Sequence, residues 1–143
     1  MEDFKFTVPY QVRIADINYG GHVANSAVLN FFQDARISYL KSLGDYSELN
    51  IGGGCGIIQT EAKIKYLGEM YMHDQLEIGV RIVAMGRLSF TMRYRIERDG
   101  KATAEGETVL ACFDYQAKRP RRFSPEFRQS IEAFEGDALN AAT

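Results

Sequence analysis

The hydrophobic residues of this chain repeat with two different periods. From residue 8 to residue 14 they alternate with polar residues, which predicts a strand. From about residue 25 to residue 43 they recur every three or four positions and leave only a narrow polar stripe, as in a helix that other structure largely encloses. We predict that Asn25 or Ser26 caps the free amides at the start of this helix. Gly44 follows its last apolar residue and is expected to end it.

After the long helix, the period changes to two and stays so along four more segments. These predicted strands cover about residues 58–66, 76–82, 88–96 and 102–115. Asp99-Gly100 is a strong hairpin signal between the last two. Ser124-Pro125 and the apolar spacing that follows predict a short C-terminal helix.

The predicted order is therefore one strand, a long helix, four strands in an antiparallel meander, and a short helix. The long helix and the sheet each have an apolar face, and the economical solution is to bury these faces against each other. We expect an α+β fold in which a twisted five-stranded antiparallel sheet wraps around the central helix.

Length and composition narrow the functional classes. The 143 residues suit a single domain, 1–143. A net charge of -2 argues against nucleic acid as the main partner. Cys55 and Cys112 lack the spacing of a zinc site, so we expect no metal. No apolar run approaches the ~20 residues of a membrane span, and the N-terminus has no secretory apolar core, so we expect a cytoplasmic protein without a membrane partner.

A motif in the turn before the long helix points to a known family. Residues 12–25 contain V-R-x-x-D-x-N-x-x-G-H-V-x-N. This resembles the signature of the 4-hydroxybenzoyl-CoA thioesterase branch of the hotdog superfamily, roughly V-R-x-x-D-x-D-x-x-G-H-V-N-N, followed by a helix ending in E-E-A-R. The corresponding helix here carries Gln33-Asp34-Ala35-Arg36. Further matches extend the resemblance over about residues 8–133; they are Glu61, Lys65-Tyr66-Leu67, Gly86-Arg87-Leu88-Ser89 and the Asp99-Gly100 turn.

The resemblance implies a hotdog fold and an acyl-CoA or acyl-carrier-protein thioesterase that needs no cofactor. It also implies that the strand carrying Glu61 lies at the sheet edge, and that two such edges pair in a homodimer or homotetramer. Each active site would then combine a helix start from one subunit with a strand from the other.

The helix start can supply the carbonyl-polarising group that thioester hydrolysis needs. Backbone amides near Ala24 and Asn25 lie at the positive end of the helix dipole and can bind the thioester oxygen. The glycine pair Gly20-Gly21 lets a substrate approach the backbone closely, although it can also serve only the turn.

The group that activates water departs from the family pattern, because Asn18 stands where the family commonly has the catalytic Asp. A neutral amide cannot act as a general base, although it can orient water or the thioester. The candidates for the base are Asp16, supported by His22, and Glu61 from a partner subunit. Each has a structural alternative: Asp16 can brace the turn, His22 and Asn18 can be turn residues, and Glu61 can be solvated beside Lys63.

Two further groups of charged residues have both functional and structural interpretations. The basic cluster Lys118, Arg119, Arg121 and Arg122 can bind the phosphates of coenzyme A, or it can be a solvated turn. Asp34 and Arg36 of the long helix are expected to form a buried tie to the sheet, with a place in the pocket wall as the alternative.

Three functions remain open at this point. The first is an acyl-CoA or acyl-carrier-protein thioesterase. The second is a hotdog module that binds acyl-CoA without hydrolysing it, which Asn18 favours. The third, a hotdog dehydratase or hydratase, needs a histidine and an acidic residue paired across the site and a different helix motif.

Overall fold

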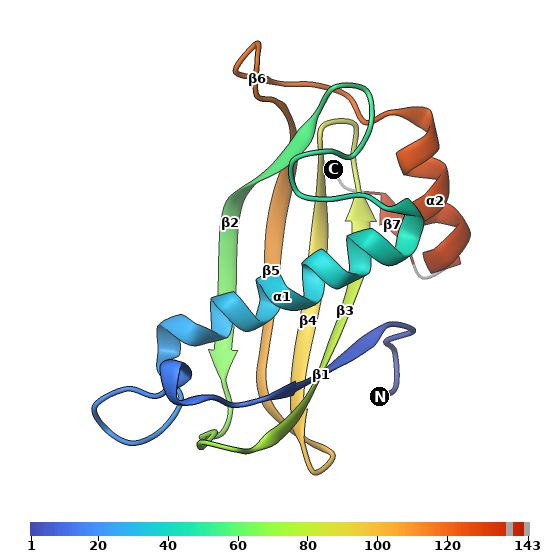
Figure 1. Ribbon diagram of the computed structural model, residues 1–143. Coiled ribbons are helices and arrows are strands. Elements are labelled where there is room, and N and C mark those ends of the chain that lie inside the picture. The colour runs from blue at the N-terminus through green and yellow to red at the C-terminus, as the bar shows by residue number, and fades with distance from the viewer. Residues whose placement is uncertain (137–138, 142–143) are drawn as a thin grey trace.

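One long helix lies across a face of an antiparallel sheet in the computed structural model, which describes residues 1–136 and 139–141 (Figure 1). In chain order the elements are β1 (Thr7–Gln11), a 3-10 turn (Ile14–Asp16), α1 (Asn25–Gly44), β2 (Gly56–Tyr66), β3 (Gln75–Met85), β4 (Ser89–Arg98), β5 (Lys101–Asp114), β6 (Arg119–Pro120), α2 (Pro125–Glu135) and β7 (Asn140–Ala141). This confirms the predicted α+β architecture of a sheet around a central helix with a short C-terminal helix. None of the helices in the described ranges is long and apolar enough to cross a membrane.

The sheet order differs from the predicted meander. The strands follow the order β1-β3-β4-β5-β2, with β6 pairing with β5 and β7 with β3. Only β3, β4 and β5 form a meander, because β2 pairs with β5 instead of β3. Alternation identifies strands but not their partners. The burial of the strands agrees with this order, since β3 is buried along most of its length while β2 is exposed along most of its length, as an edge strand is.

Both ends of α1 are built differently from the prediction. Asn25 is the first helical residue and Ala24 is the N-cap, which provides no side-chain hydrogen bond, so neither Asn25 nor Ser26 caps the helix. At the other end Gly44 is still helical, and Asp45 takes the left-handed conformation with φ 62°. The first strand is also shorter than predicted. It ends at Gln11, and the 3-10 turn from Ile14 leads the chain towards α1.

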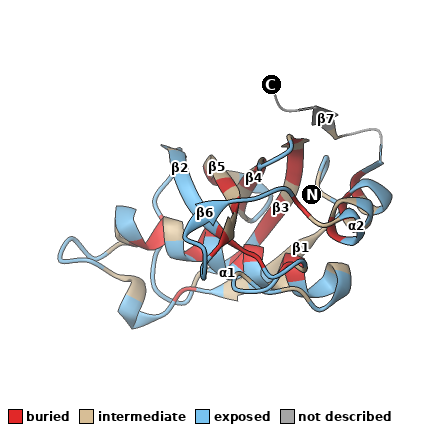
Figure 2. Ribbon diagram, turned by 90° about the horizontal axis from the view of Figure 1, so that it is seen from above, coloured by how far each residue is buried: buried red, intermediate tan, exposed pale blue. Residues whose placement is uncertain are grey.

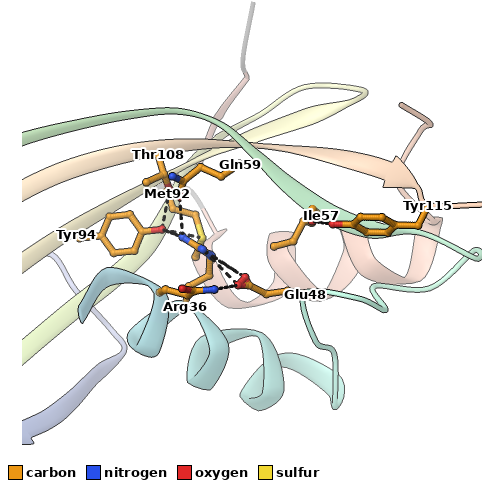
Figure 3. A network of polar contacts seen from close by, with 9 residues as sticks. Arg36, Glu48, Ile57, Gln59, Met92, Tyr94, Thr108 and Tyr115 are labelled. Carbon is orange, nitrogen blue, oxygen red and sulfur yellow. Dashed lines mark hydrogen bonds and ion pairs between the residues drawn. The ribbon is translucent and has the colours of Figure 1, made fainter. Parts of the chain in front are cut away.

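A buried arginine ties α1 to the sheet (Figure 3). The Arg36 guanidinium donates to Tyr94 Oη at 3.0 Å and to Gln59 Oε1 at 3.3 Å, and it pairs with Glu48 at 3.3 Å. Asp34, the predicted partner, is exposed. Residues two apart lie on opposite sides of a helix, so Asp34 cannot share the buried side of Arg36. The predicted tie to the sheet is confirmed for Arg36, but its carboxylate partner is Glu48 in the loop after the helix.

The aromatic layer between helix and sheet depends on one glycine. The Phe32 ring stacks on Tyr94 with 4.3 Å between centroids. A Cβ at Gly106 of β5 would lie 2.6 Å from both the Phe32 ring and the Lys63 carbonyl. Gly106 therefore provides the room in which α1 approaches the sheet.

The short helix α2 lies near the Gly44 end of α1 (Figure 1), and it has both buried and exposed residues (Figure 2). Ser124 caps it by accepting a hydrogen bond from the Phe127 amide at 3.2 Å, as the Ser-Pro start predicts. Its last residue, Glu135, is buried and accepts hydrogen bonds from the Tyr39 hydroxyl and the Ile82 amide. Burial and the Glu135 charge raise the pKa of Tyr39, so this phenol remains a donor. The same carboxylate thus holds α1, α2 and β3 together.

Candidate active site at the start of the long helix

Asp16 braces the turn that leads into α1. Its Oδ2 accepts hydrogen bonds from the Tyr10 hydroxyl at 2.7 Å and from the Arg13 amide at 3.0 Å. Burial and the hydrogen bond to Asp16 raise the pKa of Tyr10 to about 12, so the phenol stays protonated and keeps donating. The Asp16 carbonyl also accepts from the Ala24 amide at 2.9 Å. These contacts give Asp16 the structural role that the sequence offered as an alternative to catalysis.

Asn18 shapes the same turn through its side chain. Its Oδ1 accepts from the Gly20 amide at 2.9 Å, and its backbone amide donates to the His22 carbonyl at 3.0 Å. Gly21, with φ 84°, takes the left-handed conformation that the turn requires. Asn18 thus forms an Asx turn, and its carbonyl oxygen is already engaged.

His22 and Asn25 stand closer to the helix start. His22 Nδ1 lies 3.1 Å from the Val23 carbonyl, which can only accept, so Nδ1 carries the proton and Nε2 is the acceptor in the neutral ring. The Asn25 carbonyl accepts from the Tyr66 hydroxyl at 3.1 Å, which ties the end of β2 to the first turn of α1. Since α1 has no side-chain cap, the amides of Asn25 and Ser26 remain free to bind a ligand.

A pocket of about 240 Å³ opens at this point, between the helix start and the segment that follows β2. It is lined by His22, Val23, Asn25, Val28, Tyr66, Gly68, Glu69 and Met70. The structure therefore brings together two predicted site residues, His22 and Asn25. Asp16 and Asn18 lie in the turn behind them and do not line this pocket.

Glu61 lies on the opposite face of the sheet. The register of β2 against β5 shifts at Thr60, so that Gln59 faces Leu110 while Glu61 faces Val109. Leu110 is buried towards the helix, and Gln59 accepts from Arg36 on that side (Figure 3). A change of facing residue by one reverses the side on which the strand projects, so Glu61 projects away from α1. Strict alternation along β2 would place Gln59 and Glu61 on the same face, but the register shift between them puts them on opposite faces.

Glu69 is a site residue that the sequence analysis missed. It belongs to the pocket, follows Gly68, and lies more than forty positions after the motif that marks the helix start. The feature of the sequence that could have located Glu69 is Tyr66, because Tyr66 ends β2 and the loop with Glu69 follows it. This signal becomes usable only when the pairing of β2 with β5 is known.

The basic cluster occupies the other end of the sheet. Lys118, Arg119, Arg121 and Arg122 are exposed, and the three arginines line an open depression with Gly53, Cys55, Leu88 and Pro120. Arg121 also pairs with Asp114 at 2.9 Å. Gly56 pairs with Phe113 beside the cluster, whereas Tyr66 pairs with Ala104 near the helix start. Ten residues of strand separate these points, roughly 33 Å, so one chain does not bring the cluster to the pocket.

Neither cysteine resembles a reactive nucleophile. Both are buried, and burial together with the neighbouring Cys55 raises the pKa of the Cys112 thiol to about 12. Within residues 1–136 and 139–141, His, Cys, Asp and Glu form no group of three or more that could hold a metal ion.

Comparison with known proteins settles the family. The model of the thioesterase-like superfamily matches residues 12–131. The chain belongs to the thioesterase-like superfamily. This membership confirms the family resemblance and the hotdog fold, and it places the chain among thioester hydrolases.

Individual members of the superfamily are similar over nearly the whole chain. A 1,4-dihydroxy-2-naphthoyl-CoA hydrolase of Synechococcus elongatus is 26% identical over 83% of this chain and 88% of that protein. The acyl-CoA thioesterase YbgC of Haemophilus influenzae is 24% identical over 92% of this chain and 97% of that protein. A thioesterase from Thermus thermophilus, solved with coenzyme A and zinc, is 28% identical with a TM-score of 0.81, covering 95% of this chain and 98% of that one.

Proposed function

We propose that this protein hydrolyses acyl-CoA thioesters, releasing a carboxylate and coenzyme A. The observation that carries the proposal is the pocket at the uncapped start of α1, in a chain of the thioesterase-like superfamily. A thioester oxygen in the pocket can accept hydrogen bonds from the Asn25 and Ser26 amides. The negative charge that develops on this oxygen is stabilised by these amides and by the helix dipole.

The proposal is tested by incubating the protein with short, long and aromatic acyl-CoAs and measuring the free thiol that is released. We expect hydrolysis of at least one class, with a carrier-protein thioester as a further substrate to compare. If acyl-CoA binds, as calorimetry would show, but no member of the panel releases thiol, the protein is an acyl-CoA-binding module and the proposal is wrong.

We further propose that the protein acts as a homodimer, or as a tetramer built from such dimers, joined through the exposed edge of β2. Residues 58–63 of this strand are exposed, and an unpaired edge invites a second strand. If β2 pairs antiparallel with the partner's β2, the Gly56 end of one strand lies beside the Tyr66 end of the other. The basic cluster of the partner then lies at the same end of the joined sheet as the pocket, where it can bind the coenzyme A phosphates.

Neutralising the basic cluster is expected to raise KM for acyl-CoA and to leave kcat unchanged. The substitutions are Lys118→Gln, Arg119→Gln, Arg121→Gln and Arg122→Gln, and the increase in KM should shrink as salt screens the charges. Steady-state kinetics at two ionic strengths measure both effects. A control neutralises Arg93 and Arg95 of β4, which pair with Glu107 and Glu105 on the outer face of the sheet. An unchanged KM at low salt would assign the cluster to a solvated turn, and a stable monomer in light scattering would exclude the shared site.

A further inference from the structure

The pocket at the helix start contains a carboxylate that the family motif does not mark. Of the predicted carboxylates, Asp16 is engaged in the turn and Glu61 projects from the other face of the sheet. Among the residues that line the pocket, only Glu69 carries a carboxylate. If the protein is the thioesterase proposed above, this side chain is in a position to meet a water molecule beside the substrate.

The backbone around Glu69 is held from several sides. The amides of Leu67 and Gly68 both donate to the Thr103 carbonyl, at 2.9 and 3.1 Å. Next to Glu69, the Met70 carbonyl accepts from the Val23 amide at 2.7 Å, which joins this segment to the residue just before the helix N-cap. The segment carrying the carboxylate is therefore attached directly to the segment that carries the free amides.

Arg98 at the end of β4 adds a further support. Its Nη1 donates to the Glu69 carbonyl at 2.6 Å and to Asp74 Oδ2 at 2.8 Å. Burial alone would raise the pKa of Asp74, but the Tyr71 amide and Arg98 outweigh it and lower that pKa, so the ion pair persists at neutral pH. A loop fixed in this way keeps a catalytic group in place.

The Glu69 side chain is oriented by Tyr71. The Tyr71 hydroxyl donates to Glu69 Oε2, and this hydrogen bond raises the pKa of Tyr71, so the phenol remains the donor. Within the described part of the chain, Oε1 of Glu69 accepts no comparable hydrogen bond. One carboxylate oxygen is thus anchored, and the other oxygen of this exposed side chain is left to accept a proton from water.

We propose that Glu69 is the general base that replaces the missing aspartate of the family motif. Its carboxylate takes one proton from water while the water oxygen forms a bond to the thioester carbon, whose oxygen rests on the Asn25 and Ser26 amides. The tetrahedral intermediate collapses with cleavage of the C–S bond, and Glu69 returns the proton to the departing thiolate. The carboxylic acid product then ionises and releases one proton to solvent.

The test compares Glu69→Gln with Glu69→Asp in the full-length protein. The amide cannot accept the proton, so we expect Glu69→Gln to lower kcat by roughly 10²–10⁴-fold with little change in KM. Glu69→Asp keeps a carboxylate and should recover part of this loss. We expect an acid limb in the pH–kcat profile of the wild type and its loss in Glu69→Gln. Glu105→Gln on the outer face of the sheet is the matched control and should behave as wild type.

The outcomes separate this proposal from the proposed function. If the wild type releases thiol but Glu69→Gln keeps at least a tenth of its kcat with the acid limb intact, the protein is a thioesterase with another base, and His22→Ala then tests His22. If the wild type releases no thiol from any acyl-CoA, both proposals fail. Because Glu69 is exposed, its replacement should not alter the thermal unfolding midpoint; an equal loss of kcat and folded protein in both variants would assign Glu69 a structural role.

Discussion

Replacing Asn25 with proline should lower kcat for acyl-CoA hydrolysis by roughly 10²–10³-fold, the usual effect of losing one oxyanion donor. Proline removes the backbone N–H that we assign to the thioester oxygen. It should not break α1, because Asn25 is the first helical residue, where proline is favoured. Ala24 already has φ -66° and ψ 142°, the extended conformation that a residue before proline prefers.

Two controls separate the amide from the side chain and from folding. Asn25→Ala keeps the backbone N–H and removes the side chain, so it reports what the side-chain carboxamide of Asn25 contributes. Circular dichroism and thermal unfolding of Asn25→Pro should match those of Asn25→Ala. If both variants lose the same activity, the effect belongs to the Asn25 side chain, and the backbone N–H of Asn25 is not an oxyanion donor.

The same variant can reveal whether the site is shared between subunits. Heterodimers of Asn25→Pro with the neutralised basic-cluster variant contain one pocket with intact amides beside one partner with an intact cluster. If the cluster acts across the interface, these heterodimers regain activity at low substrate concentration. If it acts within its own chain, each pocket in the heterodimer stays defective.

Replacing Arg36 with methionine should lower the free energy of unfolding by about 3–5 kcal/mol, because it leaves buried polar partners without their cation. Tyr94 and Gln59 each lose a hydrogen bond, and Glu48, with a side chain 21% exposed, loses its ion pair. Urea unfolding at one fixed protein concentration measures the change. The large effect is expected because the Arg36 side chain is only 5% exposed.

An exposed ion pair provides the comparison. Arg93 and Glu107 pair at 2.7 Å on the outer face, and Arg93→Met should cost less than about 1 kcal/mol. Adding Glu48→Leu to Arg36→Met should restore part of the lost stability, since it removes the unpaired carboxylate. An Arg36→Met protein as stable as Arg93→Met would mean that this network does not hold the helix on the sheet.

Most of the fold follows from the sequence because its main signals are local. The helical period located α1 to within a residue, and period two located every long strand. The pairing of β2 with β5 did not follow, since it depends on which strand can be left exposed at the edge. The helix cap was also missed, because the motif at that point leaves the first-turn amides uncapped.

The residues of the candidate site could likewise be predicted only where they lie close to one another in the chain. His22 and Asn25 lie within the motif and reach the pocket through the turn that contains them. Glu69 reaches the same pocket through a strand pairing, and Glu61 is turned away by a bulge, so neither position can be read from residue order. The Arg36 partner was misassigned for a similar reason, because Glu48 approaches through the loop after α1.

The extra residue at Thr60 has an evolutionary consequence. Gln59 and Glu61, on either side of it, pair with the adjacent residues Leu110 and Val109. Deletion of this one position would therefore restore a regular ladder and leave every side chain of β2 on its present face. Deletion of a different single residue within β2 would instead reverse all the side chains beyond it. Related chains can thus gain or lose a residue at this position while keeping both the surface of β2 and the pocket.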